Sequence, residues 1–268
     1  MAVYAGEIER HFISVTRHNV AIPGLPAQFD GATIAQLSDI HLDNYTEPLF
    51  LEHAVNVVND LNPDYVFLTG DYVTNGLTTT KFARGAAWQC ADILRNLKCS
   101  QRYAILGNHD VLVGSKEIKL AFDDNGIPML VNSCTALERG ETRIWLAGLD
   151  DAAESHPRID LAIPEGIRGI AEEPVILLCH EPDYADNILR TPAGRAVSLM
   201  LSGHTHGGQV RFPMMGPMNL PSLGKKYVEG WFRLGDLQLY VNRGLGAVGV
   251  PFRFNCPPEI SVFTLRRA

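Results

Sequence analysis

The sequence is short of paired cysteines, long apolar runs and positive charge, and each shortage excludes a class of protein. Its five cysteines form no C-x-x-C pair and are odd in number, which argues against a disulfide scaffold and favours a reducing compartment. No apolar stretch approaches the length of a membrane-spanning helix. The formal charge of -7 argues against a dedicated nucleic-acid binder, so we expect no nucleic-acid partner.

The chain does contain five polar motifs, and each one follows an apolar run. The five runs predict buried strands at 32–37, 65–69, 103–106, 175–178 and 196–201. The motifs that follow them are, in order, Asp39-Ile40-His41, Gly70-Asp71, Gly107-Asn108-His109-Asp110, Cys179-His180 and Gly203-His204-Thr205-His206. Ligands bind at the carboxyl ends of strands in open α/β sheets. Because the motifs supply oxygen and nitrogen donors, they suit a pair of divalent cations.

Apolar spacing between the motifs predicts the remaining elements. Helices are expected at 47–61, 79–97 and 115–125. Their alternation with the first three strands indicates an α/β fold with a parallel sheet. Further on, the pattern predicts three strands within 129–149, a helix at 158–170, a helix at about 183–190, and strands with many turns after 209.

The order of the five motifs resembles the calcineurin-like metallophosphoesterases. The segments 207–210 and 243–246 look like a bacterial branch of that superfamily, the membrane- or cell-wall-associated phosphoesterases, which includes UDP-diacylglucosamine hydrolases. The resemblance covers nearly the whole chain and implies a four-layer α-β-β-α sandwich with mixed sheets. We therefore expect a single domain over 1–268, in which residues 1–30 form N-terminal edge strands and a turn.

The resemblance also implies seven ligands for two divalent metal ions, of which Mn, Zn, Fe and Co all suit the mixed ligation. The implied ligands are Asp39, His41 and His206 for a first ion, Asn108, His180 and His204 for a second, and Asp71 as a bridge. A hydroxide shared by two such ions attacks phosphorus near neutral pH. Successive side chains of an extended chain point to opposite sides. In extended D-x-H and H-x-H motifs the first and last side chains would therefore share one side, and the middle side chain would pack on the other.

Four more residues are candidates for the site, two of them catalytic and two of them substrate-binding. His109 resembles the family's catalytic histidine, which protonates the leaving oxygen or stabilises charge on the phosphoryl group. Asp110 would orient His109, and a cap of the following turn explains it equally well. Arg243 would contact a phosphate or form a structural salt bridge. Met215 lies in an apolar, proline-rich loop that predicts either core packing or a lid over an acyl chain.

Two functions stay open at this point. The first is a metal-dependent phosphodiesterase or pyrophosphatase that acts on a phosphate ester. The apolar loop favours a lipid-linked substrate and peripheral contact of the protein with a membrane. The second is a non-catalytic scaffold of the same fold that binds a partner protein, against which the complete ligand set argues. Glu7, Glu9 and Arg10 exclude a signal peptide at the start. In the resembling branch a segment like 7–15 commonly follows a membrane anchor or export signal. We therefore expect a bacterial protein associated with the membrane or cell envelope, and the alternative is a cytoplasmic protein with a natural start at Met1.

Overall fold

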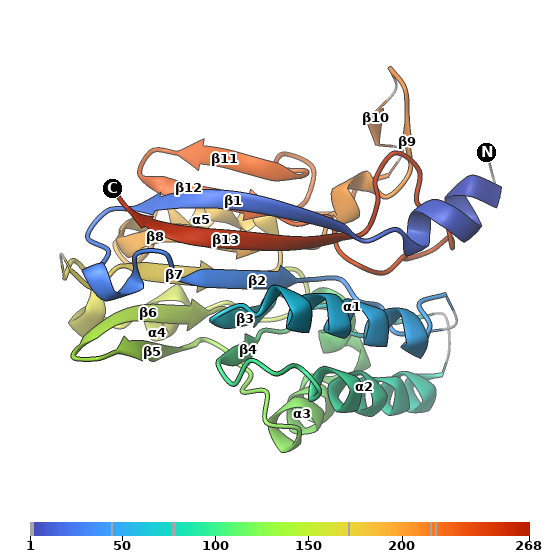
Figure 1. Ribbon diagram of the computed structural model, residues 1–268, viewed down its shortest axis with the longest axis horizontal. Coiled ribbons are helices and arrows are strands. Elements are labelled where there is room, and N and C mark those ends of the chain that lie inside the picture. The colour runs from blue at the N-terminus through green and yellow to red at the C-terminus, as the bar shows by residue number, and fades with distance from the viewer. Residues whose placement is uncertain (1–2, 44, 77–78, 171, 215, 218) are drawn as a thin grey trace.

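The computed structural model describes residues 3–43, 45–76, 79–170, 172–214, 216–217 and 219–268, and two mixed β-sheets form its centre (Figure 1). In the first sheet the strands lie in the order β1 (Ser14–Ile22), β13 (Glu259–Arg267), β2 (Thr33–Leu37), β3 (Tyr65–Leu68) and β4 (Arg102–Ala104). In the second they lie in the order β11 (Gly230–Leu234), β12 (Leu237–Val241), β8 (Val197–Ser202), β7 (Val175–Leu178), β6 (Thr142–Gly148) and β5 (Ser133–Arg139).

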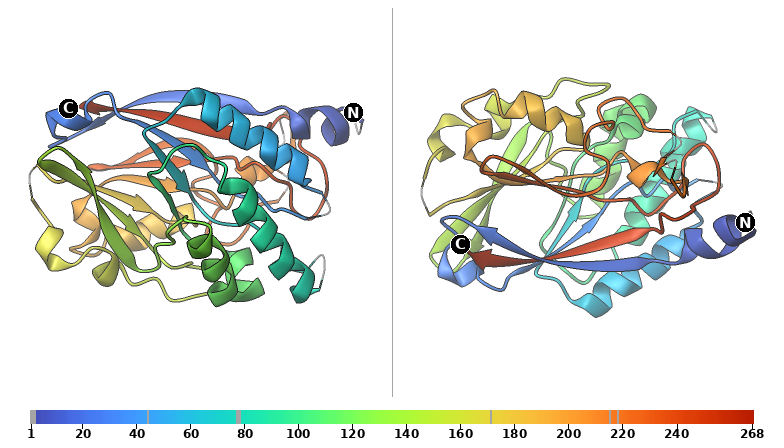
Figure 2. Two further views of the ribbon diagram at one scale, coloured as in Figure 1. Left: turned by 60° about the horizontal axis from the view of Figure 1, so that its bottom comes forward. Right: turned by 90° about the horizontal axis from the view of Figure 1, so that it is seen from above.

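Helices cover the outer faces of both sheets (Figure 2). The first sheet carries α1 (Pro48–Leu61), α2 (Thr80–Leu94) and α3 (Asn108–Asp124), and the second carries the short helices α4 (Ile159–Ala162) and α5 (Ala185–Ile188). Buried side chains from both sheets, such as Phe67 and Leu199, meet in one apolar layer between them. The predicted four-layer α-β-β-α sandwich with mixed sheets is therefore confirmed.

Parallel pairing brings the polar motifs to one edge of the sandwich. Strands β2, β3 and β4 run parallel to one another, and so do β6, β7, β8 and β12. Each of the strands β2, β3, β4, β7 and β8 ends a few residues before one of the five motifs. The carboxyl ends of parallel strands point the same way, which is why motifs far apart in the sequence meet.

Several predicted elements have different bounds in the structure. The third helix begins at Asn108 rather than 115 and breaks at Gly114, where φ is 141°. Residues 129–149 form two strands, not three, because Met129 makes only an isolated bridge to Ala104 before the β5–β6 hairpin. The helix predicted at 158–170 is reduced to α4 and a 3₁₀ turn at Glu165–Ile167.

Two small features lie beside the edge that carries the motifs. The hairpin of β9 (Arg211–Phe212) and β10 (Gly216–Pro217) projects from the sandwich on the side where the chain begins (Figure 1). The N-terminal helical turn at Tyr4–Ile8 precedes β1. Within the ranges described above, no helix is both long enough and apolar enough to cross a bilayer.

Candidate metal centre

All seven candidate ligands lie at the carboxyl edge of the strands. Six of the seven, all but Asn108, fall with His109 into three groups of mutually close donors, each group spanning no more than 4.8 Å. The groups are Asp39 with His41 and His206, His41 with Asp71 and His109, and Asp71 with His180 and His204. The first group has the three residues expected for one ion, and the third has the expected bridge with two of the three residues expected for the other.

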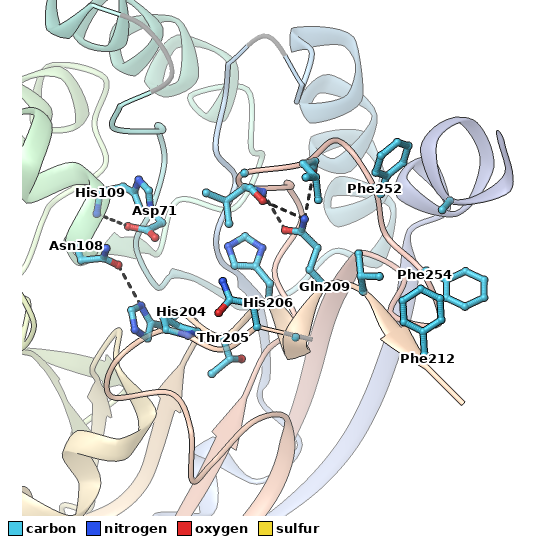
Figure 3. A pocket seen from close by; sticks show the side chains of 18 residues that line it. Asp71, Asn108, His109, His204, Thr205, His206, Gln209, Phe212, Phe252 and Phe254 are labelled. Carbon is cyan, nitrogen blue, oxygen red and sulfur yellow. Dashed lines mark hydrogen bonds between the residues drawn. The ribbon is translucent and has the colours of Figure 1, made fainter. Parts of the chain in front are cut away.

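Asp71 touches histidines from both sets. Its Oδ2 atom lies 3.4 Å from His41 Nε2 and 3.2 Å from His180 Nε2. In the second set, His204 Nδ1 lies 3.0 Å from Asn108 Oδ1, so the candidate amide ligand joins that set (Figure 3). In the first set, His206 Nε2 lies 3.4 Å from Asp39 Oδ1. A shared carboxylate between two donor sets is the arrangement that a pair of cations requires.

The backbone at the candidate ligands is left-handed rather than extended. The φ angles of Asp39, His41, Asp71, His204 and His206 are 49°, 48°, 58°, 71° and 50°. The expectation that D-x-H and H-x-H lie in extended chain is therefore wrong, because β2 and β8 end before the motifs and the first and last residue of each motif are left-handed. Positive φ is uncommon for residues with a Cβ, and such strain gathers at functional sites.

Two motif glycines are required by close approach. A Cβ on Gly107 would lie 2.6 Å from the backbone nitrogen of Asp71 and closer still to its carboxylate. A Cβ on Gly203 would overlap the carboxylate of Asp39. Neither glycine has a positive φ, so the absence of a side chain, not backbone freedom, lets the motif loops pack against the two acids.

Hydrogen bonds behind the histidines fix which nitrogen each presents. Thr74 donates its hydroxyl proton to Asp43, so its oxygen accepts from His41 Nδ1 at 3.1 Å and leaves Nε2 free. His180 Nδ1 donates to the carbonyl of Thr69 at 2.7 Å. Conversely, His204 Nε2 donates to the Ser222 carbonyl at 2.7 Å and leaves Nδ1 free. Such outer contacts orient metal-binding histidines.

One buried nitrogen shows that the residues present fit a cation. His180 Nε2 is buried and makes no hydrogen bond, although it lies near Asp71. A buried nitrogen without a hydrogen bond is costly unless another group satisfies it. Carboxylate, imidazole and amide donors around it suit a borderline divalent ion.

The pKa values follow from burial and from the mixture of charges. Burial opposes ionisation of Asp71, yet the nearby His180 and His109 hold its pKa well below the ordinary value. Burial and the adjacent His180 lower the pKa of His204 to about 4. Burial also opposes a proton on His180, but Asp71 raises its pKa well above the ordinary value. A cation bound here would therefore displace a proton from His180.

His109 lies at the wall of the site with one nitrogen already engaged. Its Nδ1 accepts the backbone N–H of Asn75 at 3.0 Å, and its own backbone N–H donates to Asp71 Oδ1 at 2.9 Å. Burial lowers the pKa of its ring. A neutral ring whose Nδ1 accepts must carry its proton on Nε2, which makes Nε2 a donor.

The Asp110 carboxylate accepts hydrogen bonds from backbone N–H groups rather than from the His109 ring. Its carboxylate accepts the N–H groups of Asp71 at 2.8 Å, Tyr72 at 2.9 Å and Gly107 at 3.0 Å. Burial and the charge of Asp71 raise its pKa to about 7. The sequence left open whether Asp110 orients His109 or caps the following turn, and these contacts are those of a cap. They also fix the loop that carries Asp71.

The two candidate substrate contacts have different outcomes. Arg243 donates from both its backbone nitrogen and Nε to Glu259, at 3.0 and 3.1 Å, which is the salt-bridge alternative. Met215 lies outside the described residues. From the sequence we did not identify Thr74, Asp43 and the Ser222 carbonyl, which orient His41 and His204. The only signal in the sequence was Asp43, a carboxylate two residues after the D-x-H motif.

A cavity of about 630 Å³ opens from the candidate metal centre. At one end it is lined by Asp71, Asn108, His109, His204 and His206 (Figure 3). Its other end is apolar and is formed by Phe212, Val250, Phe252 and Phe254 with Ala5 of the N-terminal turn. The cavity thus joins a polar, ligand-rich end to an aromatic and aliphatic end.

Comparison with known proteins agrees with this geometry. Residues 32–208 match the sequence model of the calcineurin-like phosphoesterases. The chain belongs to this family. Over 98% of its length it is 35% identical to the metallophosphoesterase YkuE of Bacillus subtilis, of which it covers 89%, and over 85% it is 30% identical to the phosphodiesterase YaeI of Escherichia coli, of which it covers 80%.

Two further proteins resemble the chain, one in sequence and one in fold alone. A transmembrane protein with a metallophosphoesterase domain from Danio rerio is 31% identical over 93% of the chain, which covers 56% of that protein. The solved structure of an NAD nucleotidase from Haemophilus influenzae superposes with a TM-score of 0.54, at 14% identity, over 81% of this chain and 46% of that one. At that identity the likeness concerns the fold alone.

Proposed function

We propose that this phosphoesterase is a two-metal enzyme that hydrolyses a phosphodiester or pyrophosphate bond. The single observation that carries the proposal is the position of Asp71, whose carboxylate lies between two sets of nitrogen and oxygen donors. The name of the Escherichia coli relative, a phosphodiesterase, supports a diester rather than a monoester.

Each candidate residue has a role in this proposal. Asp39, His41 and His206 would hold one divalent ion, Asn108, His180 and His204 would hold the other, and Asp71 would be shared. Two ions held in this way would supply a water-derived nucleophile near neutral pH and would neutralise charge on the phosphoryl oxygens. Mn, Zn and Fe all suit the mixed donor set.

The other residues act on the substrate and on the geometry of the site. His109 donates a hydrogen bond from Nε2 to the phosphoryl or leaving oxygen, because the Asn75 amide keeps Nδ1 as an acceptor. Asp110 positions Asp71 through its three backbone hydrogen bonds. Arg243 would reach a phosphate only by leaving Glu259.

The apolar end of the cavity supports a substrate with an apolar portion. A phosphate held by the metal ligands leaves the adjoining part of the substrate against Phe252, Phe254 and Phe212. We therefore propose a lipid-linked phosphodiester or pyrophosphate, such as a nucleotide-linked acylated sugar, and peripheral contact with a bacterial membrane or envelope. The transmembrane relative from Danio rerio is consistent with activity near a membrane.

Metal content and hydrolysis, measured together, test the two-metal proposal. The protein is loaded with Mn²⁺ or Zn²⁺, its metal content is measured by mass spectrometry, and hydrolysis of bis(p-nitrophenyl) phosphate is followed. Asp71→Asn should reduce both quantities, because it removes charge from the shared ligand. Asp236→Asn, which changes an exposed acid in the β11–β12 turn, is the matched control and should change neither.

Two outcomes would contradict this proposal in different ways. Full metal content in Asp71→Asn would mean that Asp71 is not a shared ligand. Protein that carries two metal ions but hydrolyses neither diesters nor pyrophosphates would favour the scaffold alternative, in which the fold binds a partner protein.

A further inference from the structure

Exposed apolar side chains line the cavity or lie within two residues of one that does. They come from three segments: the N-terminal turn, the β9–β10 hairpin and the loop that precedes β13. We call them the apolar rim, which consists of Val3, Tyr4, Phe212, Met214, Val250 and Phe252, all of them exposed. Phe212, Val250 and Phe252 also line the cavity, so the rim continues its apolar wall to the surface.

The six rim side chains are uncharged; of the nearest ionisable side chains in the same segments, Glu7 is exposed, Arg211 pairs with Glu229, and Arg253 is buried. The stretches 1–6, 212–224 and 244–252 contain no Asp, Glu, Lys, Arg or His, in a chain whose formal charge is -7. An uncharged apolar surface on an acidic protein does not attract anionic groups, and its favourable interaction is the removal of apolar area from water. Exposed apolar patches at a cavity mouth mark interaction sites.

Hydrogen bonds fix the backbone of two of the three segments that carry the rim, the loop before β13 and the N-terminal turn. The Gln209 amide donates to the carbonyls of Val248 and Val250 at 3.1 and 3.0 Å and accepts the Val248 N–H at 2.9 Å. The Arg253 N–H donates to the Ala5 carbonyl at 3.1 Å, which fastens the N-terminal turn to the same loop. The apolar side chains of the loop and of the N-terminal turn are therefore held beside one another by a fixed backbone.

We propose that the apolar rim is a membrane-docking surface that inserts into the acyl region of a lipid bilayer. Its occupant is lipid because the rim is uncharged and continuous with the cavity that ends at the metal ligands. A lipid chain can pass from the bilayer along Phe252 and Phe254 without crossing water, while its phosphate reaches His109 and Asp71. The catalytic consequence depends on the proposed function, whereas the docking itself does not.

Vesicle flotation tests the surface without any enzymatic readout. The metal-loaded protein is mixed with neutral phosphatidylcholine vesicles, and the bound fraction is measured at low and high salt. The rim variant Val3→Ser/Met214→Ser changes two exposed apolar residues that do not line the cavity. The matched control Leu120→Ser/Leu161→Ser changes two exposed leucines on α3 and α4.

We expect the parent and the control to bind neutral vesicles equally, with little effect of salt, because apolar insertion is not screened. The rim variant should bind about tenfold more weakly or worse, since it loses two apolar side chains from the inserted surface. All three proteins should hydrolyse the soluble diester at the same rate.

Several results would overturn the docking surface. These are no vesicle binding by the parent, equal binding by the rim variant, or binding only to anionic vesicles that salt abolishes. A parent dimer in light scattering that the rim variant lacks would assign the surface to a second copy of the chain. Hydrolysis of the soluble diester without vesicle binding refutes the docking surface alone, and vesicle binding without hydrolysis refutes the proposed function alone.

Discussion

Replacing Gly107 with alanine tests whether close packing of the motif loops fixes the shared carboxylate. Gly107 has a φ of -112°, which alanine adopts without strain, so backbone strain does not contribute to the effect. The added Cβ would lie 2.6 Å from the Asp71 backbone nitrogen and 2.9 Å from its Cγ. Gly107 is also the N-cap of α3, where alanine is a much poorer cap than glycine, so capping contributes to the loss of stability.

The size of the displacement follows from the structure. Since Cβ contacts shorter than 3.0 Å essentially do not occur, the Asp71 nitrogen must move by at least 3.0 − 2.6 = 0.4 Å, and its carboxylate further. Catalytic groups tolerate roughly 0.5 Å, and a 1 Å misplacement costs about 10²-fold in rate. We therefore expect kcat/KM to fall by about tenfold to a hundredfold and unfolding stability by about 1–3 kcal/mol.

Three measurements together check this prediction. They are diester hydrolysis, metal content after dialysis and urea unfolding. The control is Gly85→Ala in α2, where an added Cβ meets no atom within 4 Å. It should raise stability by about 0.5–1 kcal/mol and leave activity unchanged. If Gly107→Ala keeps parental activity and both metal ions, the argument from close approach is refuted.

Three further changes test separate parts of the site and the fold. His109→Ala should lower kcat by about 10²–10⁴ while metal content stays near normal; metal loss equal to that of Asp71→Asn would make His109 a ligand instead. Thr74→Ala removes the acceptor behind His41 and should weaken metal affinity by about 10–100-fold in a chelator competition, whereas Thr74→Ser should not. Burial opposes ionisation of Glu259, but the charge of Arg243 and the hydrogen bonds to the Glu259 carboxylate hold the pKa of Glu259 below its ordinary value of 4.5. The ionised carboxylate therefore stabilises the fold above pH 4.5, and this stabilisation is lost as the pH falls through the pKa of the folded state. Urea unfolding of Glu259→Gln should therefore show lower stability than the parent at pH 7 and a smaller difference in acid; a constant difference would contradict this.

The sequence by itself determined the strands that carry the motifs and the composition of the candidate site. Short apolar runs followed at once by polar motifs specify β2, β3 and β7, because a buried strand must be apolar on both faces. The helical spacing of apolar residues similarly specified α1 and α2, with errors of only a few residues at their ends.

Only the tertiary structure decided the conformation of the ligands and the shape of the cavity. Left-handed backbone at Asp39 and His41 depends on packing between loops from different strands, which no local pattern encodes. The placement of β13 between β1 and β2 likewise joins segments from opposite ends of the chain.

The apolar end of the cavity is the clearest example of a feature that the sequence pattern does not predict. Ala5, Phe212 and Phe252 meet there although they lie far apart in the sequence, and in isolation each is an ordinary apolar residue. A motif states which chemical groups are available, because side-chain identity is local. Which groups face one another depends on chain contacts between distant segments, so the structure alone joined an apolar wall to the candidate metal ligands.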